Sequence, residues 1–277
     1  MTESTTPLHR SAAIRSEDHN RGLQLDTATV RGIVEVTPEL VRVVLHVPGL
    51  AEEPLWHRPN VAIRFYLDER FGATSRVYTV RSADAEARTI EVDVVRHGAA
   101  SPMMQWLDSL AVGDTVEFGG PRPHFAIPEP EGREVVLFAD ATSIPALYAI
   151  LQQTAPGTTG RGWVATDDET AFAELPELPG LELTRIAPGA GFASQLGEVP
   201  DPARVVVWGA GERDEMRQVR AFFRTDAGLA KDDVAVFGYW KRGTTNTEID
   251  AKRLAAYEEA LAAGGTVTEL DDLALAI

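Results

Sequence analysis

The first half of the chain alternates apolar and polar residues in short runs, which is typical of half-buried β-strands. Turn residues such as Pro48-Gly49 separate these runs. One stretch, residues 103–110, has helical spacing and ends at a Gly-Asp turn. The pattern predicts an antiparallel barrel or sandwich. Its expected strands cover residues 29–36, 41–47, 61–67, 76–82, 89–96 and 115–118.

Beyond about residue 130, nearly continuous apolar runs alternate with helical stretches. The run at residues 134–139 is typical of a parallel strand that is buried on both faces. Such alternation predicts a parallel α/β sheet of the Rossmann-like kind. Further strands are expected at residues 162–166, 181–186, 204–208 and 233–237, and helices at residues 143–153 and 212–225.

This change of pattern divides the chain, and 277 residues leave room for two cores. We expect a flexible lead-in at 1–22, a barrel domain at 23–130, a nucleotide-binding α/β domain at 131–247, and a helix and tail at 248–277. The polar lead-in lacks the apolar segment of a secretion signal. The sequence contains no run of about twenty apolar residues, so no membrane span is predicted.

Composition removes several classes of chemistry. The chain has no cysteine, which excludes disulfides, iron–sulfur clusters and thiol catalysis and is consistent with a cytoplasmic location. No two of its six histidines stand at metal-ligand spacing, so a zinc site is not expected. The net charge of −16 argues against a nucleic-acid partner. An anionic ligand must therefore meet a local basic pocket.

The strand Arg-Val-Tyr-Thr-Val-Arg at residues 76–81 carries groups that suit a flavin nucleotide. Arg76 can hold a diphosphate, the Tyr78 ring can lie against the isoalloxazine, and the Thr79 hydroxyl can bond a ring nitrogen. Taken alone, the same pattern also fits an ordinary exposed strand face.

A second stretch runs from Val94 through His97 and Gly98 to Ser101-Pro102 and the predicted helix. The start of a helix presents free N–H groups, so this segment can cradle a diphosphate. An ordinary strand-to-helix turn is the alternative.

Two further stretches follow predicted strands of the α/β half. In the first, Asp140 is followed by Thr142 or Ser143, which can cap a helix with Pro145 in its first turn. The second is Trp208-Gly209-Ala210-Gly211-Glu212, whose glycines permit close approach of a nicotinamide. Both are expected at strand carboxyl ends, where α/β folds bind ligands.

Residues 238–243, Gly-Tyr-Trp-Lys-Arg-Gly, follow another predicted strand end. The aromatic pair and the two bases fit either a core plug with solvated cations or a lid beside a flavin and an anionic substrate.

In this order and spacing, the stretches resemble those of the siderophore-interacting proteins of the ferredoxin-reductase-like superfamily. The resemblance covers about residues 29–243 and includes Thr37-Pro38, Gly113-Asp114 and Gly120-Pro121. It implies FAD and NAD(P)H as cofactors and reduction of a ferric siderophore to release ferrous iron, which hard oxygen ligands hold more weakly. The implied cofactor-binding residues are Arg76, Tyr78, Thr79, Val80, His97, Gly98, Ser101, Met103, Met104, Asp140, Thr142, Ser143, Trp208, Gly209, Gly211, Glu212, Tyr239 and Trp240.

The sequence departs from this family in three places. Ser101, Met103 and Met104 stand where the family usually has a glycine and small residues in the diphosphate loop, and methionine brings more bulk and no hydroxyl donor. Ala141 replaces a carboxylate, and Arg64 replaces a lysine. These departures keep two alternatives open: a non-enzymatic small-ligand or siderophore binder that has lost the flavin, and a flavin reductase with another acceptor.

Substrate attraction and donor choice follow from charge. Arg64, Lys241 and Arg242 are the residues expected to attract an anionic ferric siderophore, with solvated surface cations as the alternative. Residues 167–169, Asp-Asp-Glu, can bond ribose hydroxyls, which favours NADH, whereas Arg185 can meet the extra phosphate of NADPH. A monomer is the favoured oligomeric state.

Overall fold

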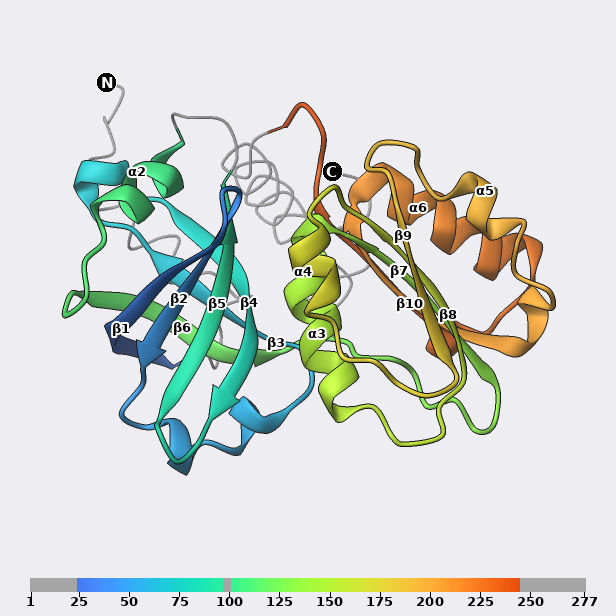
Figure 1. The fold of residues 1–277 in the computed structure, drawn as a ribbon, viewed down its shortest axis with the longest axis horizontal. Coiled ribbons are helices and arrows are strands. Elements are labelled where there is room, and N and C mark those ends of the chain that lie inside the picture. Colours follow the sequence, from blue (N-terminus) through green and yellow to red (C-terminus); the bar gives the residue numbers. More distant parts are fainter. Residues whose placement is uncertain (1–23, 97–100, 245–277) are drawn as a thin grey trace, which may run out of the picture.

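The structure is a computed structural model that describes residues 24–96 and 101–244. It comprises a β-barrel and a parallel sheet with helices on its two faces, which lie side by side (Figure 1). The predictions made for the lead-in at 1–22, for His97 and Gly98, and for the helix and tail at 248–277 lie outside the described residues.

The barrel consists of six antiparallel strands that close in the order β1-β2-β5-β4-β3-β6. Closure leaves no unpaired sheet edge. The predicted antiparallel six-stranded barrel is therefore confirmed. Its strands are β1 (Leu25–Thr37), β2 (Leu40–His46), β3 (Val61–Tyr66), β4 (Ser75–Asp84), β5 (Thr89–Val95) and β6 (Thr115–Pro123).

The period-two pattern of these strands fills the barrel. Val43 and Leu45 on β2 and Ile63 and Phe65 on β3 are buried in one core cluster. Helix α2 (Pro102–Ser109) lies between β5 and β6 in the chain and adds four buried side chains to that cluster. The barrel core thus includes both strands and the helix that the sequence placed at the predicted diphosphate loop.

The second unit is a five-stranded parallel sheet in the order β11-β10-β7-β8-β9. Strand order reverses at β7, so the carboxyl ends of β7 and β10 form the switch point at which such sheets bind ligands. This arrangement confirms the predicted Rossmann-like fold. The strands are β7 (Glu134–Asp140), β8 (Gly160–Ala165), β9 (Leu181–Ile186), β10 (Val205–Glu212) and β11 (Val234–Trp240).

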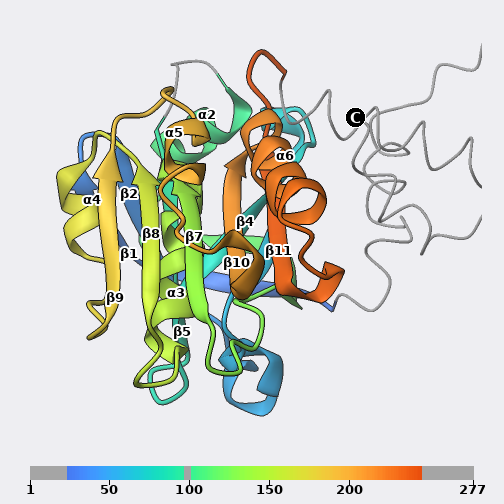
Figure 2. The ribbon, with the colours of Figure 1, turned by 90° about the vertical axis from the view of Figure 1, so that its right-hand side faces the viewer.

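Helices cover both faces of this sheet. Helices α3 (Ile144–Gln153) and α4 (Glu169–Ala173) lie on the face turned toward the barrel (Figure 1). Helices α5 (Ala193–Leu196) and α6 (Arg213–Ala221) cover the opposite face, which is turned toward the viewer in Figure 2. Two core clusters, one on each face of the sheet, result from this layering.

Two strands are longer than predicted. We predicted that the segment Trp208–Glu212 and the Gly238–Trp240 segment follow strand ends, but they lie within β10 and β11. The reason is pairing, because Gly211 pairs with Gly238 and Glu212 with Trp240. The short helices α4 and α5 were not predicted, since four or five residues carry too little periodicity.

The barrel packs through apolar contacts against the face of the sheet that α3 and α4 cover. Leu40, the first residue of β2, belongs to the core cluster that also contains Leu147 of α3. Val36 and Val95 of the barrel pack against the same cluster. No helix within residues 24–96 or 101–244 is long and apolar enough to cross a membrane.

Candidate functional site

Antiparallel pairing divides the predicted flavin residues of β4 between two faces. Tyr78 lies opposite Ile63 and faces the barrel core, with its ring centroid 5.8 Å from that of Phe65. Burial raises the pKa of the Tyr78 hydroxyl. Val80 is a core residue, which leaves its backbone for any contact with a cofactor. Thr79 lies opposite Ala62, on the other face of the strand.

Arg76 is half-buried near the beginning of β4. One terminal nitrogen of its guanidinium donates to the Thr74 hydroxyl and to the Ser75 carbonyl, each over 2.7 Å. These bonds fix the side chain beside its own strand, and its predicted role toward a diphosphate stays a prediction.

Helix α2 begins with a side-chain cap. The Ser101 hydroxyl accepts a hydrogen bond from the Met104 backbone N–H over 3.3 Å, and Pro102 occupies the first turn. Met103 and Met104 are only 2% and 6% exposed and belong to the barrel core. The methionine side chains therefore pack in the barrel core, and a contact of this segment with a phosphate stays a prediction.

The carboxyl ends of β7, β10 and β11 meet in one group of residues, here called the strand-end cluster: Asp140, Thr142, Ser143, Gly211 and Trp240. Oδ1 of Asp140 accepts from the backbone N–H and the hydroxyl of Thr142, over 2.9 and 2.6 Å. Oδ2 accepts from the Trp240 indole over 2.7 Å. The Ser143 hydroxyl donates to the Ala210 carbonyl over 2.7 Å. The structure thus joins the stretch that begins at Asp140 to residues 208–212 and to Trp240.

Burial and hydrogen bonding act in opposite directions on Asp140. The residue is 8% exposed, and this burial raises the pKa of its carboxyl group. Hydrogen bonds from Thr142 and Trp240 oppose the rise because they favour the charged form.

Two glycines of β10 are required by packing. A Cβ atom on Gly211 would lie 2.7 Å from Oδ2 of Asp140. A Cβ on Gly209 would lie 3.2 Å from the Phe138 carbonyl oxygen and 3.3 Å from the Met216 sulfur. The contacts explain these glycines without a nucleotide, so their predicted role in binding one stays a prediction.

Glu212 is 4% exposed and caps α6. Its Oε2 accepts from the backbone N–H groups of Asp214 and Glu215, over 2.7 and 3.0 Å. Its Oε1 accepts from the Arg242 backbone N–H over 3.1 Å. Burial opposes ionisation, but the hydrogen bonds from these backbone groups lower the pKa of Glu212. One carboxylate oxygen thus caps α6, and the other holds the segment after β11.

Tyr239 connects the two units. Its hydroxyl lies within hydrogen-bonding reach of the side chains of Asn60 and Thr79, both in the barrel half. Burial raises the pKa of Tyr239 to about 12, and the hydrogen bonds oppose that rise. The end of β11 therefore contacts the strand predicted to bind the flavin.

The three basic residues predicted to attract the substrate differ in their surroundings. Arg64 is 8% exposed and donates to the Ser75 hydroxyl over 2.9 Å, so it is not a solvated surface cation. Arg242 is exposed and forms a 3.3 Å ion pair with Glu215, whereas Lys241 is half-buried. Their role toward an anionic substrate stays a prediction.

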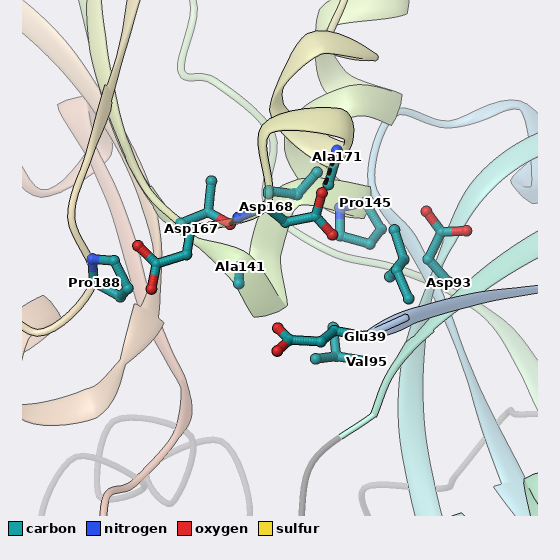
Figure 3. Close-up of a pocket in the computed structure, with 12 residues that line it drawn as sticks. Glu39, Asp93, Val95, Ala141, Pro145, Asp167, Asp168, Ala171 and Pro188 are labelled. Carbon is teal, nitrogen blue, oxygen red and sulfur yellow. Dashed lines mark hydrogen bonds between the residues drawn. The ribbon is translucent and has the colours of Figure 1, made fainter. Parts of the chain in front are cut away.

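A cavity of about 130 Å³ lies between the barrel and the ends of β7 and β8 (Figure 3). Four carboxylates line it: Glu39, Asp93, Asp167 and Asp168. Asp168 caps α4 through the Ala171 N–H over 2.8 Å and accepts from the Thr37 hydroxyl over 2.7 Å.

Two of the residues predicted to select the nucleotide, Glu169 and Arg185, form an ion pair with each other. Arg185 forms a 2.5 Å ion pair with Glu169 and donates to the Thr166 carbonyl over 3.3 Å. The guanidinium is therefore already paired beside the acidic cavity.

A sequence model described as "Siderophore-interacting protein" matches residues 132–243, and one described as "Siderophore-interacting FAD-binding domain" matches residues 53–125. A protein of Acinetobacter baumannii named ferric acinetobactin reductase is 35% identical over 272 residues, covering 95% of this chain and 94% of its own. The chain belongs to the siderophore-interacting protein family. The resemblance stated from the sequence is thereby confirmed.

Solved structures agree with this assignment. The siderophore-interacting protein of A. baumannii superposes with a TM-score of 0.79 at 34% identity, covering 86% of this chain and 99% of the other. A ferredoxin NADP⁺ reductase of Neisseria gonorrhoeae, solved with FAD and NADP, has a TM-score of 0.61 at 16% identity and covers 78% of this chain and 99% of its own. The latter match shows a shared fold.

Sequence reasoning did not single out Asn60, Tyr148 or Glu174. Asn60 has a positive φ of 59° and donates to the Phe125 carbonyl over 2.7 Å. Its position after Pro59 is a turn signal. Tyr148 and Glu174 contact charged residues far away in the sequence, which no local pattern reveals.

Proposed function

We propose that this protein is a flavin-dependent oxidoreductase that uses NADH to reduce ferric iron bound by a siderophore. Family membership, the FAD-binding domain match and the name of the A. baumannii relative support this function. The contact of Tyr239 with Thr79 carries the proposal. It brings the predicted flavin strand to the strand ends at which an α/β sheet binds a nucleotide.

The residues around β4 and α2 fit FAD. Because Met103 and Met104 are buried in the core, the capped start of α2 is not crowded by their side chains. Its N–H groups and the Arg76 guanidinium would hold the diphosphate. The Thr79 hydroxyl would contact the ring system, and the half-buried Tyr78, on the opposite face of β4, would reach it only along the uncovered edge of its ring. When bound, FAD supplies the ability to accept a hydride and to release electrons singly.

The protein's own groups orient and shield this site. With a pKa of about 12, the Tyr239 hydroxyl keeps its proton at neutral pH and remains available as a donor beside Thr79. Reduction weakens the hold of hard oxygen ligands on iron, so release needs neither an iron ligand nor a general acid from the protein. The protein's task is to position the cofactors and to admit an anionic complex.

NADH is the proposed donor because of the charge around the acidic cavity. Asp168 is already bonded to Thr37 and to the start of α4, which leaves Asp167 as the carboxylate for ribose hydroxyls. The 2′-phosphate of NADPH would meet like charges, and Arg185 is paired with Glu169. Like-charge placement of this kind discriminates between ligands.

An absorbance spectrum of the purified protein, before and after incubation with FAD and desalting, tests the function. We expect flavin bands that bleach anaerobically with NADH faster than with NADPH. Adding a ferric siderophore with a ferrous-iron chelator should then restore the bands and give the coloured ferrous complex. A protein that retains no FAD would contradict the proposal and support the non-enzymatic binder.

The alternative acceptors are separated by the same experiment. The hypothesis of a non-enzymatic binder rests on Met103 and Met104 crowding the FAD diphosphate, and the burial of both side chains in the core argues against such crowding. If quinones re-oxidise the flavin rapidly and ferric complexes do not, the flavin reductase with another acceptor is the correct function.

A further inference from the structure

Four charged residues form a network at the contact between the barrel and the sheet unit, here called the ionic clamp: Arg42, Arg81, Asp93 and Glu174. Arg42 bonds to Asp93 over 2.7 Å and to Glu174 over 2.7 Å. Arg81 bonds to Glu174 over 2.9 Å and lies 3.6 Å from Asp93. One carboxylate from the sheet unit is thus held between two guanidinium groups of the barrel.

The clamp crosses between the two units. Arg42, Arg81 and Asp93 belong to β2, β4 and β5, whereas Glu174 ends α4. The Arg81 guanidinium also lies 3.4 Å from the centre of the Tyr148 ring on α3. Two helices of the sheet unit therefore contact the same arginine of the barrel.

Because it is buried, this network is an unfavourable way to hold the two units together by binding energy alone. Arg81 and Asp93 side chains are only 3% and 1% exposed. Removing such charges from water costs free energy that apolar residues would not require. Charged hydrogen bonds are, however, directional, and a planar guanidinium accepts partners only in fixed directions. The network therefore favours one relative placement of the two units.

The clamp is attached to the two parts of the site. Arg81 follows Thr79 by two residues on β4, the predicted flavin strand. Tyr148 lies on α3, which begins directly after Ser143 of the strand-end cluster. The clamp therefore ties the strand that carries Thr79 to the helix that follows the strand-end cluster.

We propose that the ionic clamp positions the nicotinamide side of the site against the flavin side for hydride transfer. This inference rests on the proposed function. Hydride transfer requires a close and defined approach of donor to acceptor, and a misplacement of about 1 Å can cost about 100-fold in rate. Glu174 and Tyr148 are positioning residues, since they act through Arg81.

The test compares the two half-reactions in the full-length FAD-loaded protein, using Glu174→Gln. We expect anaerobic reduction by NADH to slow by about tenfold or more, as misplacement of reacting groups predicts. The spectrum of bound FAD and re-oxidation of the photoreduced protein by ferricyanide should match the wild type, because neither requires the two units to be aligned. Glu52→Gln is the matched control, since Glu52 pairs with Arg88 over 3.6 Å within the barrel.

A second variant, Tyr148→Leu, removes the ring that lies against Arg81 and should slow the same half-reaction. It decides the matter if Glu174→Gln does not fold. Reduction by NADH at the wild-type rate in a folded variant overturns the inference. Equal slowing of both half-reactions, or loss of FAD, also overturns it, because that outcome indicates general structural damage. If NADH and NADPH both fail to reduce the wild type, the proposed function itself is wrong.

Discussion

Replacing Trp240 with Phe removes the indole N–H that donates to Oδ2 of Asp140 over 2.7 Å. The change retains an aromatic ring at the end of β11. Asp140 keeps its donors from Thr142 and from the Glu212 backbone. With 8% of the residue exposed, water replaces the missing donor poorly. We expect the substitution to destabilise the folded protein.

The magnitude follows from the charge and burial of the acceptor. A hydrogen bond to a charged group contributes about 1.5 to 3 kcal/mol to stability. Because other donors remain on Asp140, we expect a loss of about 2 kcal/mol, which corresponds to a fall in Tm of about 4 to 8 °C for a protein of this size. The loss of a donor should also raise the pKa of Asp140 further.

Thermal unfolding followed by far-UV circular dichroism at pH 7 measures the effect. The double variant with Asp140→Asn should show a coupling energy of at least about 1 kcal/mol, because the residues share one bond. A change in Tm below about 1 °C and no coupling would refute the bond, since about 1 kcal/mol alone should move Tm by more. The Trp240 indole would then be available for a cofactor.

Three other changes give measurable outcomes. Gly211→Ala places a Cβ 2.7 Å from Oδ2 of Asp140 and should cost about 1 to 3 kcal/mol by overpacking, as measured by urea unfolding; a neutral result would mean that the strand-end cluster relaxes freely. Burial opposes ionisation of Glu174, but hydrogen bonding with Arg42 and the charges of Arg81 and Arg42 lower its pKa. The contribution of ionised Glu174 to the stability of the folded protein should therefore be present above its unfolded-state pKa of about 4.3 and be lost as the pH falls through its lower folded-state pKa. The Tm values of wild type and Glu174→Gln should then converge in acid, and parallel curves of Tm against pH would contradict this. Asp167→Ser should reduce the preference of kcat/KM for NADH over NADPH by about tenfold, which is roughly the 1.4 kcal/mol expected of one hydrogen bond to a carboxylate. The control Asp226→Asn, at an exposed position, should leave this ratio unchanged. An unaltered ratio in Asp167→Ser would mean that Asp167 does not bind the ribose.

Local patterns predicted the fold well because strand and helix periods are local properties. The barrel strands and the buried run at β7 were found from alternation and from continuous apolar residues. The strand ends were less accessible. Residues 208–212 contain two glycines and resemble a loop, yet they pair with β11 as a continuous strand. That pairing depends on a segment more than twenty residues away.

The sequence supplied candidate residues for the site but not their orientation. Thr79 and Tyr239 were both selected from sequence, but their contact depends on how the barrel packs against the sheet. Met103 and Met104 were expected to face a phosphate, and only the packing of α2 shows that they fill the barrel core. Glu174 carries no motif, because its importance comes from two arginines that are distant in the sequence.

The membership of Leu40 in the core of the sheet unit has a consequence for how this protein can be divided. A barrel expressed alone would expose Leu40, with Val36 and Val95 beside it, to water. Burying one leucine side chain contributes about 1.5 to 3 kcal/mol, so the separated barrel loses stability and gains an adhesive surface. Exchange of either half between relatives should therefore succeed only when the residues on both sides of this shared core are transferred together.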